Sequence, residues 1–411
     1  MRLRSLNVGD LSVPNTVGTV LSGKKIVIIY KSLGPYHVAR LRALAEICAD
    51  LDVRLSCLEL AGSTTVYPWI VEENDRSVEW ETLFEDRAFE TIPVRELWQR
   101  LRPVLEQSSS DVVMVAGYSH EIMRKVRQWA GQNGVAAVVI SSSTHRDHRR
   151  ARWREWLKKQ VIRKFDAALV AGSRAREYIN SLGIPSDRVT LGSSVVDNTT
   201  VVREVGRYKG MEAKVREELR LPDRYFLCVA RLLKIKNLER TIRAFSDYRR
   251  LKPHEASVWD LVICGSGPEE EGLRKTAQSV GDNGIHFAGF VQQPRLFAYY
   301  AAASCLVLAS YSEPWGLVVN EAMAAGLPVL VSNACGCAPD LVLDGVNGWV
   351  CDPYDVKQLT EHMIKIASLG DKEREKMGQE GKRAVEDWGL ERFTRGAIES
   401  CRIALERKST D

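Results

Sequence analysis

The stretch SEPWGLVVNEAMAAGLPVLVS, residues 312–332, holds two glutamates, Glu313 and Glu321, between two apolar runs. The run CLVLAS at 305–310 predicts a strand that leads into the turn YSEPWG, and LPVLVS at 327–332 predicts the next strand. Between them, LVVNEAMAAG has helix-forming residues closed by a glycine. The stretch therefore predicts a strand, a tight turn and a helix, which is the repeating unit of a parallel sheet.

The start of this predicted helix is suited to an anion. The free amides of Gly316, Leu317 and Val318 favour a phosphate, and the glycine lets the backbone pass close to a ligand. Glu321, about one turn in, can accept hydrogen bonds from two adjacent hydroxyls, as on a ribose, and Glu313 can reach a different polyol. The alternative is that both are acids interacting with the helix dipole. It stays open for Glu313 but explains less at Glu321, because the dipole acts within the first turn.

The same alternation of apolar runs and amphipathic segments extends along the chain. The runs lie at 25–30, 53–60, 111–117, 136–141, 167–172, 225–230, 260–265, 285–290, 305–310 and 327–332. Continuous apolar strands between helices are typical of parallel sheets covered on both faces, so two sets predict two doubly wound α/β sheets. Ligands of such sheets bind beyond the carboxyl ends of the strands, which places the expected site in a cleft between two domains.

A polar stretch without periodicity follows the first set of strands, and we place the domain boundary near residue 205. The expected parts are a poorly ordered leader at 1–22, a first domain at 23–205, a second domain at 206–385 and a C-terminal helix at 386–411.

Two cations follow the strand expected at 225–230. Arg231 stands at its end and Lys236 shortly beyond, and a pair of fixed cations there suits a diphosphate. The alternative is a solvated loop.

The sequence GSGPEEEGL at 265–273 has a faint likeness to a dinucleotide fingerprint. Gly265 and Gly267 fit, but Glu270 occupies the third glycine position within a run of three acids that would repel a pyrophosphate. We therefore expect a tight strand-to-helix turn and disfavour NAD.

Composition limits the classes of function. Hydrophobic content of 45% and charged content of 27% are ordinary for a globular protein, and the net charge of +5 argues against a nucleic-acid partner. No run approaches the roughly 20 apolar residues that span a bilayer, and the first residues lack the apolar core of a signal peptide. The nine cysteines are scattered, which suggests reduced thiols and a cytoplasmic protein. No metal site is expected, since the one Asp-x-Asp, at 50–52, suits a surface turn.

With both glutamates in place, the segment EPWGLVVNEAMAAGLPVLVS resembles the Glu-x7-Glu signature of family 4 glycosyltransferases. The resemblance extends over most of the second half, through VARLLKIKNLERTIRAF, GSGPEEEGLRKTAQSVGDNGIHFAGFVQQ and GCAPDLVLDGVNGWVCDP. It implies a GT-B fold of two Rossmann-like domains with the cleft between them, the first on the acceptor side and the second binding the donor. It also implies a C-terminal helix that crosses back to the first domain, retention of anomeric configuration, and no cofactor or metal beside a nucleotide diphosphate sugar.

The resemblance also implies roles for individual residues. The catalytic set is Arg231 and Lys236 on the donor diphosphate, with Glu313 on the donor sugar hydroxyls. The substrate-binding set is Glu321 on the ribose, Gly316, Leu317 and Val318 through backbone amides, and Phe290 and Val291 near the base.

The first half departs from the family pattern. Gly34, beside Pro35, stands where many members have two adjacent glycines that approach the donor phosphate. His145 lies slightly after the position where members often have a histidine that contacts the donor sugar, and either a substrate contact or a solvated loop histidine fits. These departures indicate a divergent branch, so the identity of the donor is not carried over.

Residues 145–164, HRDHRRARWREWLKKQVIRK, form the most basic stretch and include Trp153 and Trp156. A basic helix with aromatic residues fits an anionic membrane surface at the inner face of the membrane. The alternative is a connecting helix whose tryptophans pack inward while its cations stay solvated.

Together with the resemblance, these features lead us to expect a retaining hexosyltransferase that moves a sugar from a UDP- or GDP-sugar to an acceptor hydroxyl. The acceptor would be a glycan, a glycolipid or a small molecule, in polysaccharide or glycoconjugate biosynthesis. Two alternatives remain, namely a nucleotide-sugar epimerase of the same fold and a catalytically silent partner subunit.

Overall fold

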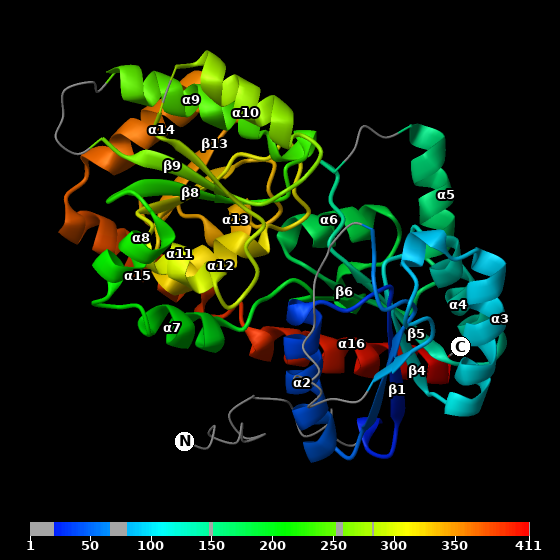
Figure 1. Ribbon diagram of the computed structural model, residues 1–411. Coiled ribbons are helices and arrows are strands. Elements are labelled where there is room, and N and C mark those ends of the chain that lie inside the picture. Colours follow the sequence, from blue (N-terminus) through cyan, green and yellow to red (C-terminus); the bar gives the residue numbers. More distant parts are fainter. Residues whose placement is uncertain (1–19, 66–79, 148–150, 252–257, 282, 411) are drawn as a thin grey trace. The chain divides into compact units, whose positions relative to one another are not determined.

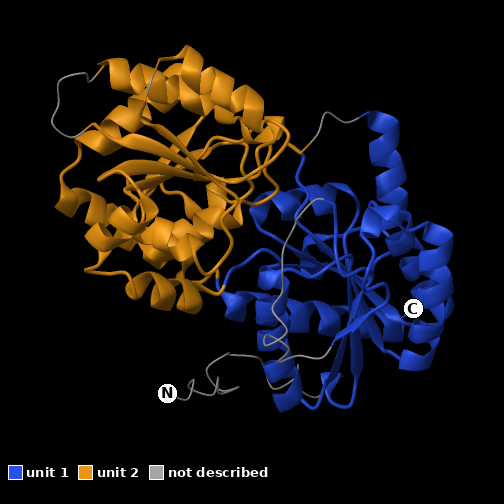
Figure 2. Cartoon of the chain, viewed as in Figure 1, with its two compact units in different colours: residues 1–145, 149–196, 389–411 blue, residues 146–148, 197–388 orange. Residues whose placement is uncertain are grey.

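The computed structural model describes residues 20–65, 80–147, 151–251, 258–281 and 283–410, so most of the expected leader at 1–22 lies outside the described residues. The chain divides into two compact units (Figure 2). Unit 1 comprises residues 1–145, 149–196 and 389–411, and unit 2 comprises residues 146–148 and 197–388. Each unit is built on one parallel sheet, as the alternation of apolar runs predicts.

Unit 1 contains a parallel sheet of seven strands in the order β3-β2-β1-β4-β5-β6-β7 (Figure 1). Its strands are β1 Lys25–Tyr30, β2 Arg54–Glu59, β3 Trp80–Thr82, β4 Val112–Ala116, β5 Ala136–Ser141, β6 Ala167–Val170 and β7 Val189–Leu191. Successive residues of β1 are buried on alternate faces: Ile26 and Ile28 share a core cluster with Phe393, and Val27 is also buried. Both faces of the sheet are therefore covered, which explains why its central strands are apolar without alternation.

The helices of unit 1 are α2 Pro35–Asp50, α3 Val94–Ser108, α4 Glu121–Gln132, α5 Arg152–Ile162, α6 Ser173–Ser181 and α16 Leu390–Thr410, with short 3₁₀ turns at Phe89–Thr91 and Ser186–Arg188. The C-terminal helix α16 crosses α2 and packs against it and on β5, β6 and β7 (Figure 1). Thr190 of β7 donates its hydroxyl to the carbonyl of Gly396 at 2.8 Å. A Cβ at Gly396 would lie 2.3 Å from the carbonyl oxygen of Leu191, so the glycine allows the helix to approach the sheet closely.

Unit 2 contains a parallel sheet of six strands in the order β10-β9-β8-β11-β12-β13. Its strands are β8 Tyr225–Val229, β9 Asp260–Cys264, β10 Ile285–Gly289, β11 Cys305–Leu308, β12 Val329–Ser332 and β13 Gly348–Cys351. The strand order reverses at β8. From β8 the chain adds β9 and β10 on one side of the sheet, and it then returns to add β11, β12 and β13 on the other side. The carboxyl ends of these strands are the place where doubly wound sheets bind ligands.

The helices of unit 2 are α7 Asn198–Gly206, α8 Glu212–Leu219, α9 Leu238–Leu251, α10 Glu270–Ser279, α11 Leu296–Ala302, α12 Leu317–Ala325, α13 Ala338–Leu341, α14 Val356–Ser368 and α15 Asp371–Glu386, with a 3₁₀ turn at Lys234–Lys236. Helices α9 and α14 pack together, and α12 packs against α15. The aromatic centre of the core is Phe226, whose ring is perpendicular to that of Tyr248 and 4.8 Å from that of Trp259, centroid to centroid.

All nine cysteines are buried, and none forms a disulfide. Cys228, Cys264 and Cys305 lie inside strands of unit 2 and contribute to its core as small apolar side chains. Burial raises the pKa of the Cys228 thiol to about 12, so the group stays protonated at neutral pH.

Replacing Gly396 by alanine is expected to lower the free energy of unfolding by about 1–3 kcal/mol, because the new methyl group overlaps the backbone of β7. The matched control is Gly272→Ala in α10, where nothing lies within 4 Å of the added Cβ. Scanning calorimetry measures both variants. Equal melting temperatures for Gly396→Ala and the parent chain would contradict the close packing of α16.

Candidate functional site

Most of the predicted site residues lie in unit 2, in the segments that follow its strands. These are Arg231, Lys236, Phe290, Val291, Glu313, Gly316, Leu317, Val318 and Glu321. Gly34 and His145 lie in unit 1, where each follows the carboxyl end of a strand.

The segment that follows β8 runs directly against the segment that follows β9. The Leu232 amide donates to the Ser266 carbonyl at 2.9 Å, and the Glu269 amide donates back to the Leu232 carbonyl at 3.1 Å. A Cβ at Gly265 would lie 1.8 Å from the Ala230 carbonyl oxygen. The glycine is thus required by backbone packing within the turn between β9 and α10, in line with the expectation of a structural turn.

Asn237 fixes the position of the 3₁₀ turn at Lys234–Lys236. It adopts the left-handed conformation, with φ of 58°, and is 2% exposed. Its side-chain amide donates to the carbonyls of Ala309 at 2.8 Å and Pro353 at 2.7 Å. The Tyr311 amide donates to the Ile235 carbonyl at 2.9 Å. The segment after β8 is therefore bonded to the segment after β11.

This arrangement brings Lys236 and Glu313 together as an ion pair. Their side chains are 18% and 13% exposed, so the pair is mostly shielded but still reachable from solvent. The backbone of Glu313 is also held, because its carbonyl accepts from the Gly336 amide at 2.8 Å. A Cβ at Gly336 would lie 1.9 Å from the Pro314 carbonyl oxygen, so this glycine lets the two loops meet. Two of the three predicted catalytic residues are therefore direct neighbours.

The start of α12 presents backbone amides. Gly316 precedes the helix with φ of 103°, a conformation that favours glycine. Among the residues that the structure describes, no acceptor is found for the amides of Gly316, Leu317 and Val318. Such orphan amides at a helix start favour a negatively charged partner.

Glu321 lies one turn inside α12 and is completely buried. One carboxyl oxygen accepts from the Tyr300 hydroxyl at 2.7 Å, and the other accepts from the side-chain amide of Gln293 at 2.8 Å. A buried carboxyl group is costly without such partners. These contacts, rather than the helix dipole, account for its place in the structure.

The remaining predicted residues of unit 2 lie in exposed or half-buried positions. Phe290 and Val291 follow β10, and the Phe290 side chain is 42% exposed, which is high for a large apolar ring. Arg231 is half-buried, two residues beyond the end of β8.

In unit 1, Gly34 is buried directly before α2. Its amide donates to Nδ1 of His37 at 3.1 Å. Burial lowers the pKa of His37 to about 3, with a further contribution from Arg40, so the ring is neutral and Nδ1 can accept. The Gly34 amide, in the loop that is expected to approach the donor phosphate, thus has a partner in this structure.

His145 follows β5 and packs on an aromatic ring. Its centroid lies 4.8 Å from that of Tyr178 in α6, in an edge-to-face arrangement. The neighbouring His148 lies outside the described residues.

The basic helix α5 exposes its aromatic side chains. Trp153 and Trp156 are each 61% exposed and Leu157 is 48% exposed, at a spacing that places all three on one face. On another face, Glu155 accepts from the Tyr178 hydroxyl at 2.9 Å, which ties α5 to α6. The alternative of inward-packing tryptophans is therefore wrong, because both indole side chains are mostly exposed and Ile162 is the buried residue of this helix.

Sequence reasoning missed three residues that organise this site: Asn237, Gln293 and Tyr300. Asn237 had a recognisable signal, because asparagine is one of the few residues that adopt the left-handed conformation after a short turn. Gln293 lies in the segment after β10 and Tyr300 lies in α11, and no local pattern connects either of them to Glu321.

Within the described ranges, no group of three or more histidine, cysteine, aspartate or glutamate side chains could hold a metal ion. In the same ranges, no helix is long and apolar enough to cross a bilayer.

Comparison with protein families gives a match to unit 2. Residues 211–384 match the family model described as Glycosyl transferases group 1. The matched segment covers nearly all of unit 2, including the Lys236–Glu313 pair and α12.

Two curated relatives align with about the same part. The D-inositol 3-phosphate glycosyltransferase of Acidothermus cellulolyticus is 31% identical over 192 residues, 44% of this chain and 41% of that protein. The GDP-mannose-dependent alpha-(1-6)-phosphatidylinositol monomannoside mannosyltransferase of Mycolicibacterium smegmatis is 34% identical over 196 residues, 45% of this chain and 49% of that protein. The alignment spans less than half of the length of these relatives.

Among solved structures, Anabaena HepE in complex with UDP and glucose has a TM-score of 0.68 at 15% identity, and the match covers 92% of this chain and 98% of that one. The likeness confirms the expected fold class of two Rossmann-like α/β units. Residues 211–384 of unit 2 are thus similar to glycosyl transferases group 1, and the two units have the Rossmann-like folds of GT-B structures.

Replacing Tyr300 by phenylalanine removes one donor from the buried Glu321 carboxyl group and keeps the ring. We expect the free energy of unfolding to fall by about 1.5–3 kcal/mol, the range for a hydrogen bond to a charged group. Scanning calorimetry measures the change. Tyr354→Phe is the control, since that side chain is 67% exposed and should leave the melting temperature unchanged. Identical melting temperatures for all three proteins would refute the contribution of this contact.

Proposed function

We propose that this chain is a retaining glycosyltransferase of family 4 that transfers a hexose from a UDP- or GDP-sugar to an acceptor hydroxyl without a metal. The observation that carries the proposal is the shielded Lys236–Glu313 pair in the segment that matches glycosyl transferases group 1. The relatives are named as glycosyltransferases, and the HepE structure holds UDP and glucose, which supports this class of donor.

In the proposed complex, the donor diphosphate lies against Arg231, Lys236 and the amides at the start of α12. Fixed cations and orphan amides stabilise charge that develops on a leaving group, because they need no reorganisation as it forms. The ion pair keeps the Lys236 ammonium in place before the donor arrives. When the donor binds, Lys236 turns to the phosphate and Glu313 becomes free to accept from sugar hydroxyls.

The reaction proposed is a displacement on one face of the sugar. The bond between the anomeric carbon and the β-phosphate oxygen breaks as the acceptor oxygen forms its bond to the same carbon. The acceptor proton passes to the departing phosphate oxygen, so the anomeric configuration is retained and no separate general base is needed.

Glu321 is proposed to bind the ribose. One of its oxygens is held by Tyr300, which is buried, and the other by Gln293, which is half-buried in the segment after β10. We propose that the ribose hydroxyls replace the Gln293 amide as donors to that oxygen. Phe290 and Val291 in the same segment then lie near the base.

Two substitutions separate these roles. Glu321→Ala should weaken the binding of UDP or GDP by about 10- to 100-fold, the equivalent of hydrogen bonds to a charged acceptor. Glu313→Ala should leave that affinity unchanged and lower kcat by about 100-fold or more, because it acts on the transferred sugar. Calorimetry with UDP and GDP measures binding, and release of nucleotide diphosphate measures turnover. Glu271→Ala, an exposed acid of α10, is the matched control.

The same assay distinguishes the alternatives. A panel of UDP-glucose, UDP-galactose and GDP-mannose is incubated with alkyl glycosides and lipid extracts, and the product configuration is read by NMR. An α-linked product from these α-linked donors supports the proposal. Epimerised nucleotide sugar from donor alone identifies an epimerase, and binding without turnover by any donor identifies a silent subunit.

We also propose that α5 contacts an anionic membrane surface, which would bring the site to a lipid-linked acceptor. The exposed face formed by Trp153, Trp156 and Leu157 supplies apolar anchors, and the surrounding cations add attraction to anionic headgroups.

Vesicles of phosphatidylglycerol and phosphatidylcholine test this contact. The protein should sediment with these vesicles at low salt and should dissociate from them in about 0.5 M salt, because salt screens the charges. It should not bind vesicles of phosphatidylcholine alone. The double variant Trp153→Ala, Trp156→Ala should lose at least about tenfold in affinity, since two interfacial anchors are removed. Tyr354→Ala, an exposed aromatic residue of unit 2, should bind as the parent does. Parent protein that stays in the supernatant at low salt would overturn the membrane proposal.

A further inference from the structure

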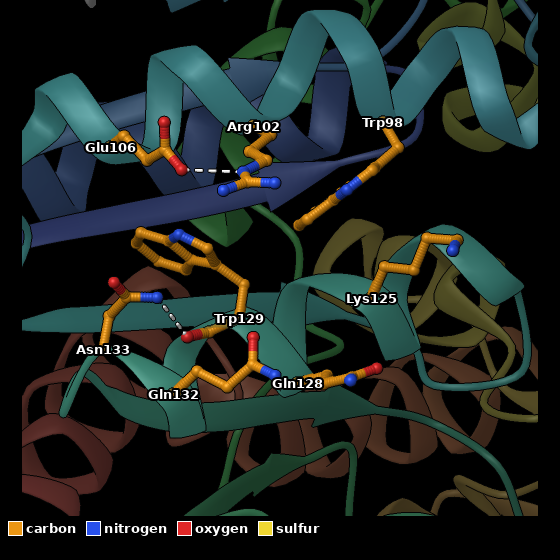
Figure 3. Close-up of a pocket in the computed structure, with 8 residues that line it drawn as sticks. All are labelled: Trp98, Arg102, Glu106, Lys125, Gln128, Trp129, Gln132 and Asn133. Carbon is orange, nitrogen blue, oxygen red and sulfur yellow. Dashed lines mark hydrogen bonds and ion pairs between the residues drawn. The ribbon is translucent and has the colours of Figure 1, made fainter.

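Unit 1 holds a pocket between α3 and α4 that none of the proposed roles uses (Figure 3). Its volume is about 260 Å³. On the α4 side it is lined by the C-terminal part of that helix, from Lys125 to Asn133, which leads into the amino end of β5. Gly34 and His145 follow the carboxyl ends of β1 and β5. The pocket therefore lies toward the opposite edge of the sheet from these predicted substrate contacts.

Two indole rings line the pocket. Trp98 of α3 is half-exposed, whereas Trp129 of α4 is only 6% exposed. The Trp129 ring nitrogen is buried and has no acceptor among the residues that the structure describes. In Figure 3 the edge of the ring that carries this nitrogen faces the side of the pocket where Arg102 and Glu106 lie. A buried N–H without a partner is unfavourable, so an acceptor supplied by a ligand would satisfy it.

The rest of the lining is polar and consists of Arg102, Glu106, Lys125, Gln128, Gln132 and Asn133. Arg102 donates through Nε to Glu106 at 2.7 Å, an exposed pair one turn apart on α3 that orients both side chains. Asn133 donates its side-chain amide to the Trp129 carbonyl at 2.8 Å, which leaves the amide oxygen as an acceptor. Gln128 adds a second side-chain amide. Donors and acceptors thus both lie beside the two aromatic rings.

This combination of groups selects the chemistry of the ligand. A purely apolar molecule would leave the amides, Lys125 and the Arg102–Glu106 pair without new partners, whereas a phosphate would meet the Glu106 carboxylate as well as the two cations. A pyranose ring has an apolar face of C–H groups that packs on an indole and a rim of hydroxyls that both donate and accept. The volume lies below the range of about 300–1,000 Å³ for drug-sized ligands, which suits a single ring.

We propose that the pocket between α3 and α4 is a saccharide-binding site that takes one pyranose residue, with Trp98 as the stacking surface and the Trp129 N–H as a hydrogen-bond donor. The site binds sugar without taking part in transfer. It goes beyond the proposed function and does not depend on it, because all of its residues lie outside the segment that matches glycosyl transferases group 1.

Saturation-transfer NMR with the full chain tests this site. The probes are methyl α-D-glucopyranoside, methyl α-D-mannopyranoside, methyl β-D-galactopyranoside and methyl β-D-glucuronide at millimolar concentration. At least one should receive saturation from the parent protein. Trp98→Ala should weaken its binding by about 10-fold or more, since stacking on the indole is lost. Trp129→Phe keeps a ring and removes the N–H, so a loss of about 2- to 10-fold is expected.

Two controls locate the bound sugar. Trp153→Ala removes an exposed tryptophan from another helix of unit 1, and Lys236→Ala alters the proposed donor site; both should bind the glycoside as the parent does. Circular dichroism confirms that each variant is folded, and Gln128→Ala, an exposed substitution, replaces Trp98→Ala if the latter unfolds. The proposal is overturned if no glycoside receives saturation. It is also overturned if binding survives both Trp98→Ala and Trp129→Phe, or if it is lost in Lys236→Ala alone.

Discussion

In unit 2, the backbone after β8 lies so close to the backbone after β9 that Gly265 has no room for a side chain. A Cβ there would come within 1.8 Å of the Ala230 carbonyl oxygen, and a Cβ at Gly267 would come within 2.5 Å of that of Leu232. Hydrogen bonds across this contact join the two segments, which leaves the first no freedom to move away from the sheet. The direction in which Lys236 projects follows from this contact.

Asn237 holds the segment after β8 against two further strand ends. Its amide bridges carbonyls of the segments after β11 and after β13, so three strand ends are bonded through a single side chain. The loops that carry Lys236 and Glu313 are separated by 77 positions in the chain, yet they form one bonded layer. The proposed site is thus formed by loops that are hydrogen-bonded to one another, as preorganised charge requires.

The sequence predicts the central strands of both sheets, such as β4, β5, β8 and β11, because nearly all of their residues are buried and apolar. It misses β3, β7 and β13, which have only three or four residues and lie at or near sheet edges. The resemblance to a family brought Lys236 and Glu313 into one site, but not into direct contact. That contact depends on the left-handed turn at Asn237, a tertiary feature. Likewise, the partners of Glu321 come from two other segments, and the exposure of Trp153 depends on how little of α5 is buried against the rest of unit 1.

The burial of every cysteine has a practical consequence for chemical labelling. Alkylating reagents attack the thiolate, and a protonated thiol within a packed core offers them neither the charge nor the access they need. The native cysteines are therefore expected not to react with maleimides while the chain stays folded. A single cysteine introduced at an exposed position such as Tyr354 would carry a fluorophore or spin label alone, with all nine natural thiols left in place.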